Sequence, residues 1–306
     1  MRLNASAAGM YVISATPFTD SGALDHDSTA SLMDFYIGCG VTGMTILGIM
    51  GEAPKLAGDE SMAFVKACLA RVKVPIIVGA SAAGLDNLFG FSKGVMDAGA
   101  AGVMIAPPAG LKTDEQIYAY YEQVARGLRG IPWVLQDFPA ATTVFMSTPL
   151  IVKMIADFTD MVMLKHEDWP GNNKITKLRE AEADGGRRVS ILIGNGGAQY
   201  SQLLERGVDG AMTGFAYPDL LVKTYDLFKA GKLDAAEDVF DACLPLIMQE
   251  MQPGVGLAVR KYALMKRGAI KCDRVRAPGP KLNPKDRAEV ERLMARLEAR
   301  IKQLNH

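Results

Sequence analysis

Eight short runs of consecutive apolar residues recur along the first two thirds of the chain. They occupy residues 11–18, 44–48, 75–80, 102–107, 132–136, 161–165, 190–194 and 210–214. Most of the intervals between them carry apolar residues at helical spacing, as in residues 28–39 and 113–128. Unbroken apolar runs that alternate with helices are typical of parallel strands buried on both faces. The pattern predicts an α/β protein, and eight such units predict a closed (β/α)8 (TIM) barrel rather than an open sheet.

Three of these runs are introduced by the same arrangement of glycines. A glycine, two residues and a second glycine precede the apolar residues of CGVTGMTIL (39–47), AGAAGVMIA (98–106) and RGVDGAMTG (206–214). A glycine that ends a helix, followed by a short turn into a buried strand, produces this arrangement. The repeat indicates that one helix-to-strand unit is used several times.

The chain becomes helical after the eighth apolar run. Helical patterns cover residues 217–232, 233–251, 255–270 and 283–304. One of them is expected to close the barrel, and the others form a C-terminal helical extension. We therefore place the barrel strands and helices in residues 1–217 and the closing and C-terminal helices in residues 218–306. No segment rich in Pro, Gly or Ser separates the two parts, so we expect one compact unit.

Composition and charge exclude several classes of partner. The 306 residues contain 34 Lys and Arg and 34 Asp and Glu, so the formal net charge is zero. Neither a nucleic acid nor a membrane surface is therefore an expected partner, and no apolar run reaches the roughly 18 residues needed to span a bilayer. The first residues lack the ordered regions of a signal peptide. The four cysteines, Cys39, Cys68, Cys243 and Cys272, form no CxxC pair, which predicts no metal site and a cytoplasmic setting.

The most informative single residue is Lys165, in MVMLKHEDWPG (161–171). The functional site of such a barrel lies at the carboxyl ends of its strands, and Lys165 ends the sixth apolar run. Burial favours the neutral form of an amine, and a neutral amine attacks carbonyl carbons to form an iminium. The alternative is that Lys165 forms an ion pair with Glu167 or Asp168. Both interpretations remain open from the sequence.

Several segments resemble the dihydrodipicolinate synthase and N-acetylneuraminate lyase family of class I aldolases. The resemblance begins with ATPF (15–18) and the GxxGE loop at residues 48–52, and continues through VPIIVGA (74–80) and DAGAAGVMIAPP (97–108). VLQDFPAAT (134–142) stands where the family has a Y-N-x-P segment, and MLKHED (163–168) stands where it carries the Schiff-base lysine. VRAPGPKL (275–282) is similar to its C-terminal arginine-proline segment.

The resemblance implies a fold, a reaction and an assembly. It implies a (β/α)8 barrel with C-terminal helices, assembled as a homo-oligomer, either a tetramer or a dimer. It also implies that Lys165 forms a Schiff base with a small-molecule substrate, a 2-oxo acid or an aldehyde, and that no metal or organic cofactor takes part. The substrate-binding residues that we expect at the carboxyl ends of the strands belong to units two, five and seven. They are Gly48, Ile49, Met50, Gln136, Gly194 and Asn195.

Three of these positions depart from the family pattern. The residues between the glycines of the second loop are commonly hydroxylic in the family, but here they are Ile49 and Met50, whose side chains have no polar hydrogen to donate. Their backbone N–H groups could still bind an anion. Gln136 replaces the tyrosine that shuttles protons, and a carboxamide cannot release and regain a proton near pH 7. The usual hydroxyl relay is therefore absent, which argues against authentic dihydrodipicolinate synthesis.

Three explanations follow from these departures. In the first, the chain is a Schiff-base-forming aldolase or dehydratase with another proton carrier. Because side chains alternate along a strand, Glu167 shares the inward side of Lys165 and is the candidate acid or base, whereas Asp137 and His166 point outward. In the second, the chain binds a small metabolite without turnover, as a regulatory protein. In the third, the glycine-rich IGNGGAQ (193–199) and MTGF (212–215) form a phosphate site.

Overall fold

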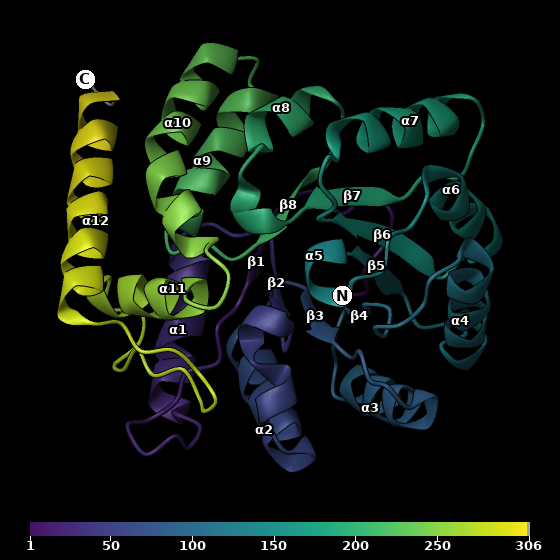
Figure 1. The fold of residues 1–306 in the computed structure, drawn as a ribbon, viewed down its shortest axis with the longest axis horizontal. Coiled ribbons are helices and arrows are strands. Elements are labelled where there is room, and N and C mark those ends of the chain that lie inside the picture. Colours follow the sequence, from purple (N-terminus) through teal and green to yellow (C-terminus); the bar gives the residue numbers. More distant parts are fainter. Residues whose placement is uncertain (305–306) are drawn as a thin grey trace.

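The computed structural model describes residues 1–304 and contains a closed parallel barrel of eight strands in sequential order (Figure 1). The strands are β1 (Gly9–Ile13), β2 (Gly43–Ile46), β3 (Ile76–Gly79), β4 (Gly102–Ile105), β5 (Trp133–Asp137), β6 (Met161–His166), β7 (Ser190–Ile193) and β8 (Gly210–Thr213). Each overlaps one of the eight apolar runs. The (β/α)8 architecture predicted from their spacing is therefore confirmed.

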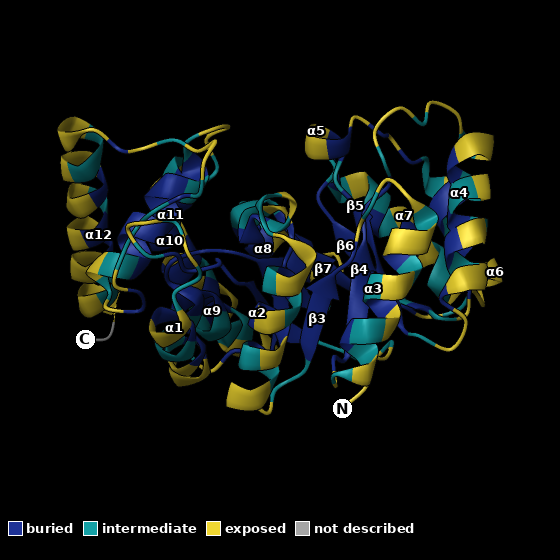
Figure 2. Ribbon diagram, turned by 90° about the horizontal axis from the view of Figure 1, so that it is seen from below, coloured by how far each residue is buried: buried dark blue, intermediate teal, exposed yellow. Residues whose placement is uncertain are grey.

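Helices surround the barrel and hide the outward face of its strands (Figure 2). The helices between strands are α1 (His26–Gly38), α2 (Gly58–Arg71), α3 (Leu85–Asp97), α4 (Asp114–Gly127), α5 (Pro139–Thr142), α6 (Thr148–Asp157), α7 (Asn172–Ala183) and α8 (Tyr200–Glu205). Side chains cap several of them: the Asp25 carboxylate accepts from Ser28 N at the start of α1, and Thr113 and Gln116 form a capping box on α4. Apolar residues fill the space between strands and helices. There the ring of Trp133 stacks on Tyr121 with 5.8 Å between centroids.

The inward side chains of the strands form layers across the barrel. Strand tilt brings inward residues of alternate strands to one level, so that each level receives four side chains. Following the strand register around the barrel gives three successive levels. From the amino to the carboxyl ends these are Tyr11, Ile77, Val134 and Leu192; then Thr45, Met104, Lys165 and Met212; then Ile13, Gly79, Gln136 and Gly194. The lower level is filled by large apolar groups, whereas the upper level contains two glycines. The backbone of Leu47 approaches Gly79 closely, and the side chain of Glu167 approaches Gly194 closely.

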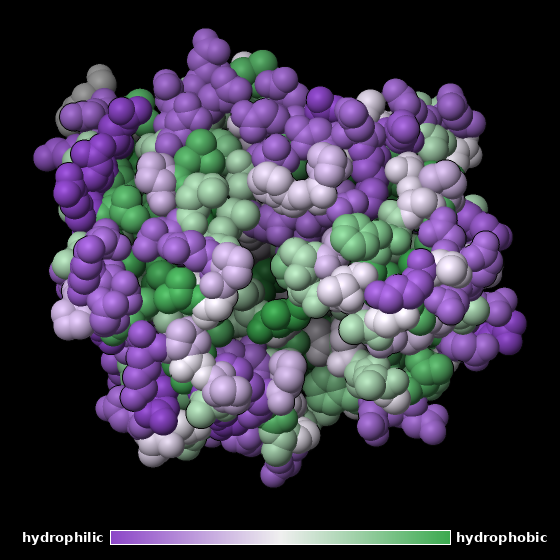
Figure 3. Space-filling model, viewed as in Figure 1, coloured by the Kyte–Doolittle hydropathy of each residue, from purple (hydrophilic) through white to green (hydrophobic). Residues whose placement is uncertain are grey.

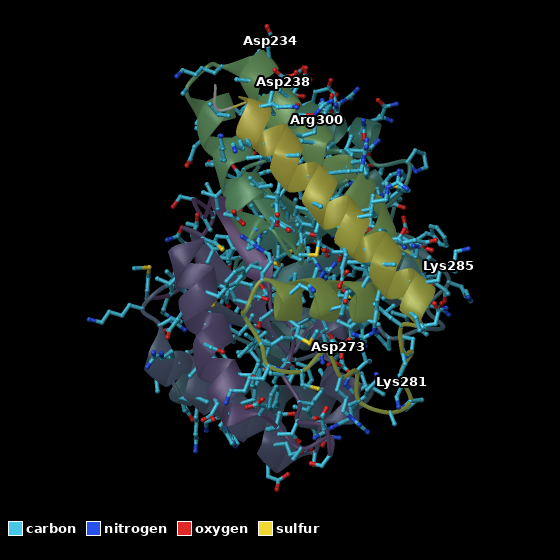
Figure 4. The ribbon with its side chains drawn as sticks, turned by 90° about the vertical axis from the view of Figure 1, so that its left-hand side faces the viewer. Asp234, Asp238, Asp273, Lys281, Lys285 and Arg300 are labelled. Atoms are coloured by element: carbon cyan, nitrogen blue, oxygen red, sulfur yellow. The ribbon has the colours of Figure 1, made fainter. Side chains whose placement is uncertain are left out.

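The extension packs on the side of the barrel where β8 meets β1. It consists of α9 (Pro218–Lys229), α10 (Leu233–Glu250), α11 (Gly256–Lys266) and α12 (Pro284–Leu304). Helix α10 packs against α9 and α12, and Figure 4 shows α12 crossing the outer surface with Lys285 and Arg300 toward its two ends. The helical patterns predicted after residue 217 correspond to these four helices. Among residues 1–304, no helix is long and apolar enough to cross a membrane.

A buried ion pair joins two of these helices to the barrel. Glu250, at the end of α10, accepts from Arg260 Nε of α11 at 2.7 Å and from the backbone N–H of Ala216, just after β8, at 3.1 Å. The side chains of Glu250 and Arg260 are 1% and 5% exposed. Burial raises the pKa of Glu250, although Arg260 opposes that effect. The pair therefore fixes the extension against the end of β8.

We expect Glu250→Ala to lower the free energy of unfolding by about 3 kcal/mol, because it leaves the Arg260 guanidinium buried and unpaired. Urea unfolding followed by circular dichroism measures the change. The matched control is Glu122→Ala, which removes the exposed Glu122–Arg126 pair of α4 and should change stability little. Equal effects of the two substitutions would contradict this account.

Candidate functional site

The carboxyl ends of the strands form one face of the molecule, on which a hollow lies near the centre (Figure 3). Hydrophobic side chains border this hollow in the same view. Lys165 lies near the end of β6, between Gln136 of β5 and Leu192 of β7 in the strand register. Its inward direction follows from strand alternation, since Met163, two residues earlier, packs among the interior residues of the barrel. The lysine side chain is 6% exposed.

Lys165 forms a short buried ion pair with Glu167. Lys165 Nζ lies 2.9 Å from Glu167 Oε2, and the glutamate side chain is also 6% exposed. Gln136 Nε2 donates to the same oxygen at 2.7 Å. The structure therefore brings together three residues singled out from the sequence, and Glu167 lies on the inward side as alternation predicted. Asp168, the other partner considered for Lys165, instead pairs with Lys174 of α7 at 2.6 Å.

The turn after β7 holds Glu167 in this position. Asn195 Nδ2 donates to the backbone carbonyl of Glu167 at 2.7 Å, and Asn195 N–H donates to Glu167 Oε1 at 3.4 Å. A side chain at Gly194 has no room, because a Cβ there would lie 2.3 Å from Glu167 Cγ and Oε1. The glycine is needed for this close approach. Gly194 and Asn195 thus position the carboxylate.

The second loop supplies apolar side chains at the same end of the barrel. Gly48 precedes a short 3-10 turn, η1 (Ile49–Gly51). Met50 packs against the apolar interior of the barrel, whereas Ile49 is 46% exposed. A Cβ at Gly48 would meet Met104 Cε at 3.5 Å and Ile13 Cγ2 at 3.9 Å. The three expected residues of this loop therefore lie above the lysine level, and their side chains add no hydrogen-bond donor.

Glu52, which ends this loop, is the centre of a buried network that the sequence did not reveal. Its carboxylate is 1% exposed and receives Lys261 Nζ of α11 at 2.5 Å, Lys55 Nζ at 3.0 Å and the backbone N–H of Arg276 at 2.9 Å. Lys261 is fully buried and also donates to the carbonyls of Thr16 and Arg274. Burial lowers the pKa of Lys261, and Glu52 opposes that shift. The only sequence signal was an Arg-Lys pair inside the apolar segment GLAVRKYAL (256–264).

Asp137 and His166 point away from the barrel interior, as alternation predicted. Asp137 Oδ2 pairs with Lys174 Nζ at 3.0 Å and lies 3.4 Å from His166 Nδ1. Lys174 also donates to the carbonyl of Met146 at 2.8 Å. This buried cluster links β5, β6 and α7 behind Lys165, so neither Asp137 nor His166 reaches the space above the lysine. Within residues 1–304, no group of three or more His, Cys, Asp and Glu side chains is arranged to hold a metal ion.

Together, these features define a (β/α)8 barrel protein with a lysine-carboxylate site at the carboxyl ends of its strands. The chain belongs to the dihydrodipicolinate synthetase family, whose family model matches residues 6–297. The resemblance inferred from the sequence segments is thereby confirmed, and the chain is a lyase of this family.

Comparisons with individual proteins agree with this assignment. The L-2-keto-3-deoxyarabonate dehydratase of Azospirillum brasilense is 30% identical over 311 residues, which cover 97% of each chain. The 4-hydroxy-tetrahydrodipicolinate synthase of Agrobacterium fabrum is 28% identical over 269 residues, covering 86% of this chain and 88% of the relative. The crystal structure of a dihydrodipicolinate synthase from Rhodopseudomonas palustris superposes with a TM-score of 0.95 at 48% identity, over 97% of this chain and 99% of that one.

We expect Gly194→Ala to displace the Glu167 side chain, because the added methyl group would occupy the position of the carboxylate. A crystal structure of the variant should show the distance between Lys165 Nζ and Glu167 Oε2 lengthened beyond 4 Å. Gly48→Ala is the matched control, since its Cβ would make only ordinary contacts and should leave that distance unchanged. An unchanged distance in Gly194→Ala would contradict the positioning role of this turn.

Proposed function

We propose that the protein is a lyase that forms a Schiff base between Lys165 and the carbonyl carbon of a 2-oxo acid-like substrate. The observation that carries the proposal is the amine of Lys165, buried inside the barrel and 2.9 Å from the Glu167 carboxylate. A buried amine with an adjacent proton acceptor has the arrangement that nucleophilic catalysis requires. Family membership supports the same chemistry.

The ion pair accounts for the protons of iminium formation. An ammonium group is not a nucleophile, so Lys165 must first lose a proton, and Glu167 Oε2 is within hydrogen-bond distance to receive it. The neutral amine then attacks the carbonyl carbon, and a proton passes from the nitrogen to the new alkoxide oxygen to give a carbinolamine. Glu167 returns the proton to the departing oxygen, which leaves as water, and the iminium remains on Nζ. Gln136 orients the carboxylate throughout through its 2.7 Å hydrogen bond.

The iminium then acts as an electron sink for one of two reactions. In a dehydratase, a base removes a proton from the carbon next to the iminium, an enamine forms, and the β-hydroxyl group then leaves as water. In an aldolase, the β-hydroxyl group itself loses its proton, and the bond between the α-carbon and the β-carbon breaks. Glu167 is the proton carrier in either case, because the carboxamide of Gln136 cannot serve. The name of the Azospirillum relative supports the dehydratase branch.

We propose a reaction other than dihydrodipicolinate synthesis, although several relatives carry that name. Ile49, Met50 and Gln136 stand where the family has the hydroxyl-bearing residues of its proton relay. The carboxylate beside the amine here belongs to Glu167. The proton carrier proposed here thus comes from β6 and its following turn rather than from the loops after β2 and β5.

We further propose that the chain is a homo-oligomer and acts in the cytoplasm. Family resemblance supports self-association, and Phe145 and Trp169 are large apolar side chains that are 69% and 53% exposed. Light scattering coupled to size-exclusion chromatography measures the molar mass in solution, and a mass of one chain would contradict self-association. Such a result has a precedent, because one relative at 24% identity is described as a monomeric variant. The unpaired thiols of Cys39, Cys68, Cys243 and Cys272 suit a reducing compartment.

We expect borohydride to trap a covalent adduct between the protein and pyruvate or another 2-oxo acid, detected by intact mass and mapped by peptide mass to Lys165. Lys165→Ala should abolish the adduct, whereas Lys177→Ala, which removes an exposed lysine of α7, should not. Failure to trap any carbonyl compound, or an adduct that persists in Lys165→Ala, would refute the covalent mechanism. An adduct without turnover of any 2-oxo acid would favour the binding-protein alternative.

We expect Glu167→Gln to lower kcat by about two to four orders of magnitude, because the proton carrier is lost while the side-chain shape is kept. Borohydride trapping at equilibrium should persist in this variant. Turnover equal to that of the unchanged protein would remove Glu167 from the mechanism.

A further inference from the structure

The second loop, residues 47–52, has a strained backbone at both of its ends. Leu47 and Glu52 have φ angles of 53° and 58°, in the left-handed region that residues with a side chain rarely adopt. Such conformations persist only where surrounding contacts enforce them, and they are concentrated at functional sites. The loop follows β2 at the carboxyl ends of the strands, where the candidate site lies. The contacts that hold this loop are therefore expected to serve the site.

The most buried of these contacts comes from the C-terminal extension. Lys261 Nζ of α11 donates to Glu52 Oε1 at 2.5 Å and to the carbonyl of Thr16, after β1, at 2.8 Å. Both the lysine and the glutamate side chains are buried. Thr16 Oγ1 in turn donates to the carbonyl of Gly51 at 2.6 Å. Lys261 therefore connects the loop after β2 to the segment after β1.

An aromatic ring of the first loop lies between two cations of the same network. Lys261 Nζ lies 4.5 Å from the centroid of the Phe18 ring, and the guanidinium carbon of Arg276 lies 4.3 Å from that centroid. The ring is fully buried, and a cation is attracted to the face of such a ring. The backbone N–H of Arg276 also donates to Glu52 Oε2 at 2.9 Å. The conformation of Glu52 thus depends on the extension and not on the loop alone.

On its inner side, the second loop contacts the apolar interior of the barrel. Met50 packs against the interior cluster that contains Met104, and the strand register places Met104 on the level of Lys165. A Cβ at Gly48 would lie 3.5 Å from Met104 Cε. Displacement of the loop would therefore change the wall of the site above the lysine. The residues proposed to transfer protons lie on β5, β6 and the following turn, so they would stay in place.

We propose that Lys261 is a positioning residue for the reaction at Lys165: by holding Glu52, it keeps the loop after β2 in the conformation that binds the substrate. This inference rests on the proposed function and adds to it a dependence on the C-terminal extension. The side chains of the loop carry no proton, so its displacement weakens substrate binding and leaves proton transfer between Lys165 and Glu167 intact. A loss of stability alone would instead lower the fraction of active molecules without changing their affinity.

The test uses pyruvate as the probe and measures affinity and rate separately. The concentration that gives half-maximal borohydride trapping reports affinity. In D2O, each cycle of enamine formation and reprotonation replaces a methyl proton of pyruvate with deuterium, and proton NMR gives the maximal rate of this exchange. In Lys261→Met, the half-saturating concentration should rise about ten-fold or more, whereas the maximal exchange rate should stay within about three-fold of that of the unchanged protein.

A second variant and a matched control separate positioning from stability. The double substitution Glu52→Gln with Lys261→Met removes both charges, so no buried carboxylate loses its counter-ion. It should be more stable than Lys261→Met, while the half-saturating concentration stays raised because the loop is still not held by the lysine. The control is Arg187→Ala, which removes donors to the carbonyls of Phe158 and Met161, each at 2.9 Å, at the amino end of β6. It should lower the midpoint of thermal unfolding and leave the half-saturating concentration unchanged.

The outcomes distinguish this inference from the proposed function. An unchanged half-saturating concentration in the double variant overturns the positioning role of Lys261 and leaves the Schiff base standing. A double variant that regains both stability and affinity also overturns it, because the pair then acts only on the stability of the fold. A fall in the maximal exchange rate at unchanged affinity overturns it as well. Absence of an adduct or of exchange in the unchanged protein contradicts the proposed function, and the inference falls with it.

Discussion

The constraint on which the site depends is the burial of one amine inside an apolar barrel. Lys165 shares its level with two methionines, and a charged ammonium group in such surroundings needs a partner. Glu167 provides it at 2.9 Å. The carboxylate in turn needs its own donors and its own space. Gln136 and Asn195 supply the donors, and Gly194 supplies the space. The need to pair one buried amine therefore constrains which residues can stand at the carboxyl ends of β5, β6 and β7.

The side chains inside the barrel change from apolar to polar over a few residues along the barrel axis. Below the lysine, the level formed by Tyr11, Ile77, Val134 and Leu192 is buried and apolar. Above it, Gly79 and Gly194 allow the backbone of Leu47 and the side chain of Glu167 to approach closely. The C-terminal extension stabilises the loops around these strand ends. Lys261 of α11 fixes the second loop through Glu52, and the Glu250–Arg260 pair fixes the end of β8. The extension is thus part of the structure that positions the candidate site.

The periodic features of the chain were predictable from the sequence, and the contacts between distant segments were not. Unbroken apolar runs predicted all eight strands, because both faces of each strand are buried. Alternation along β6 and its continuation predicted that Glu167 would lie inward and His166 outward. By contrast, the pairing of Glu52 with Lys261 joins residues on the second loop and α11, and no local pattern encodes it. The level shared by Thr45 and Lys165 requires the register of every strand between them. The need for glycine at position 194 appears only when the Glu167 side chain is placed.

The most direct test of the central claim is a crystal structure of the protein soaked in pyruvate. The account predicts continuous electron density from Lys165 Nζ to the keto carbon, with the Glu167 carboxylate beside the new bond. Pyruvate bound elsewhere, or bound at this site without a bond to Nζ while the Lys165–Glu167 ion pair stays intact, would contradict it.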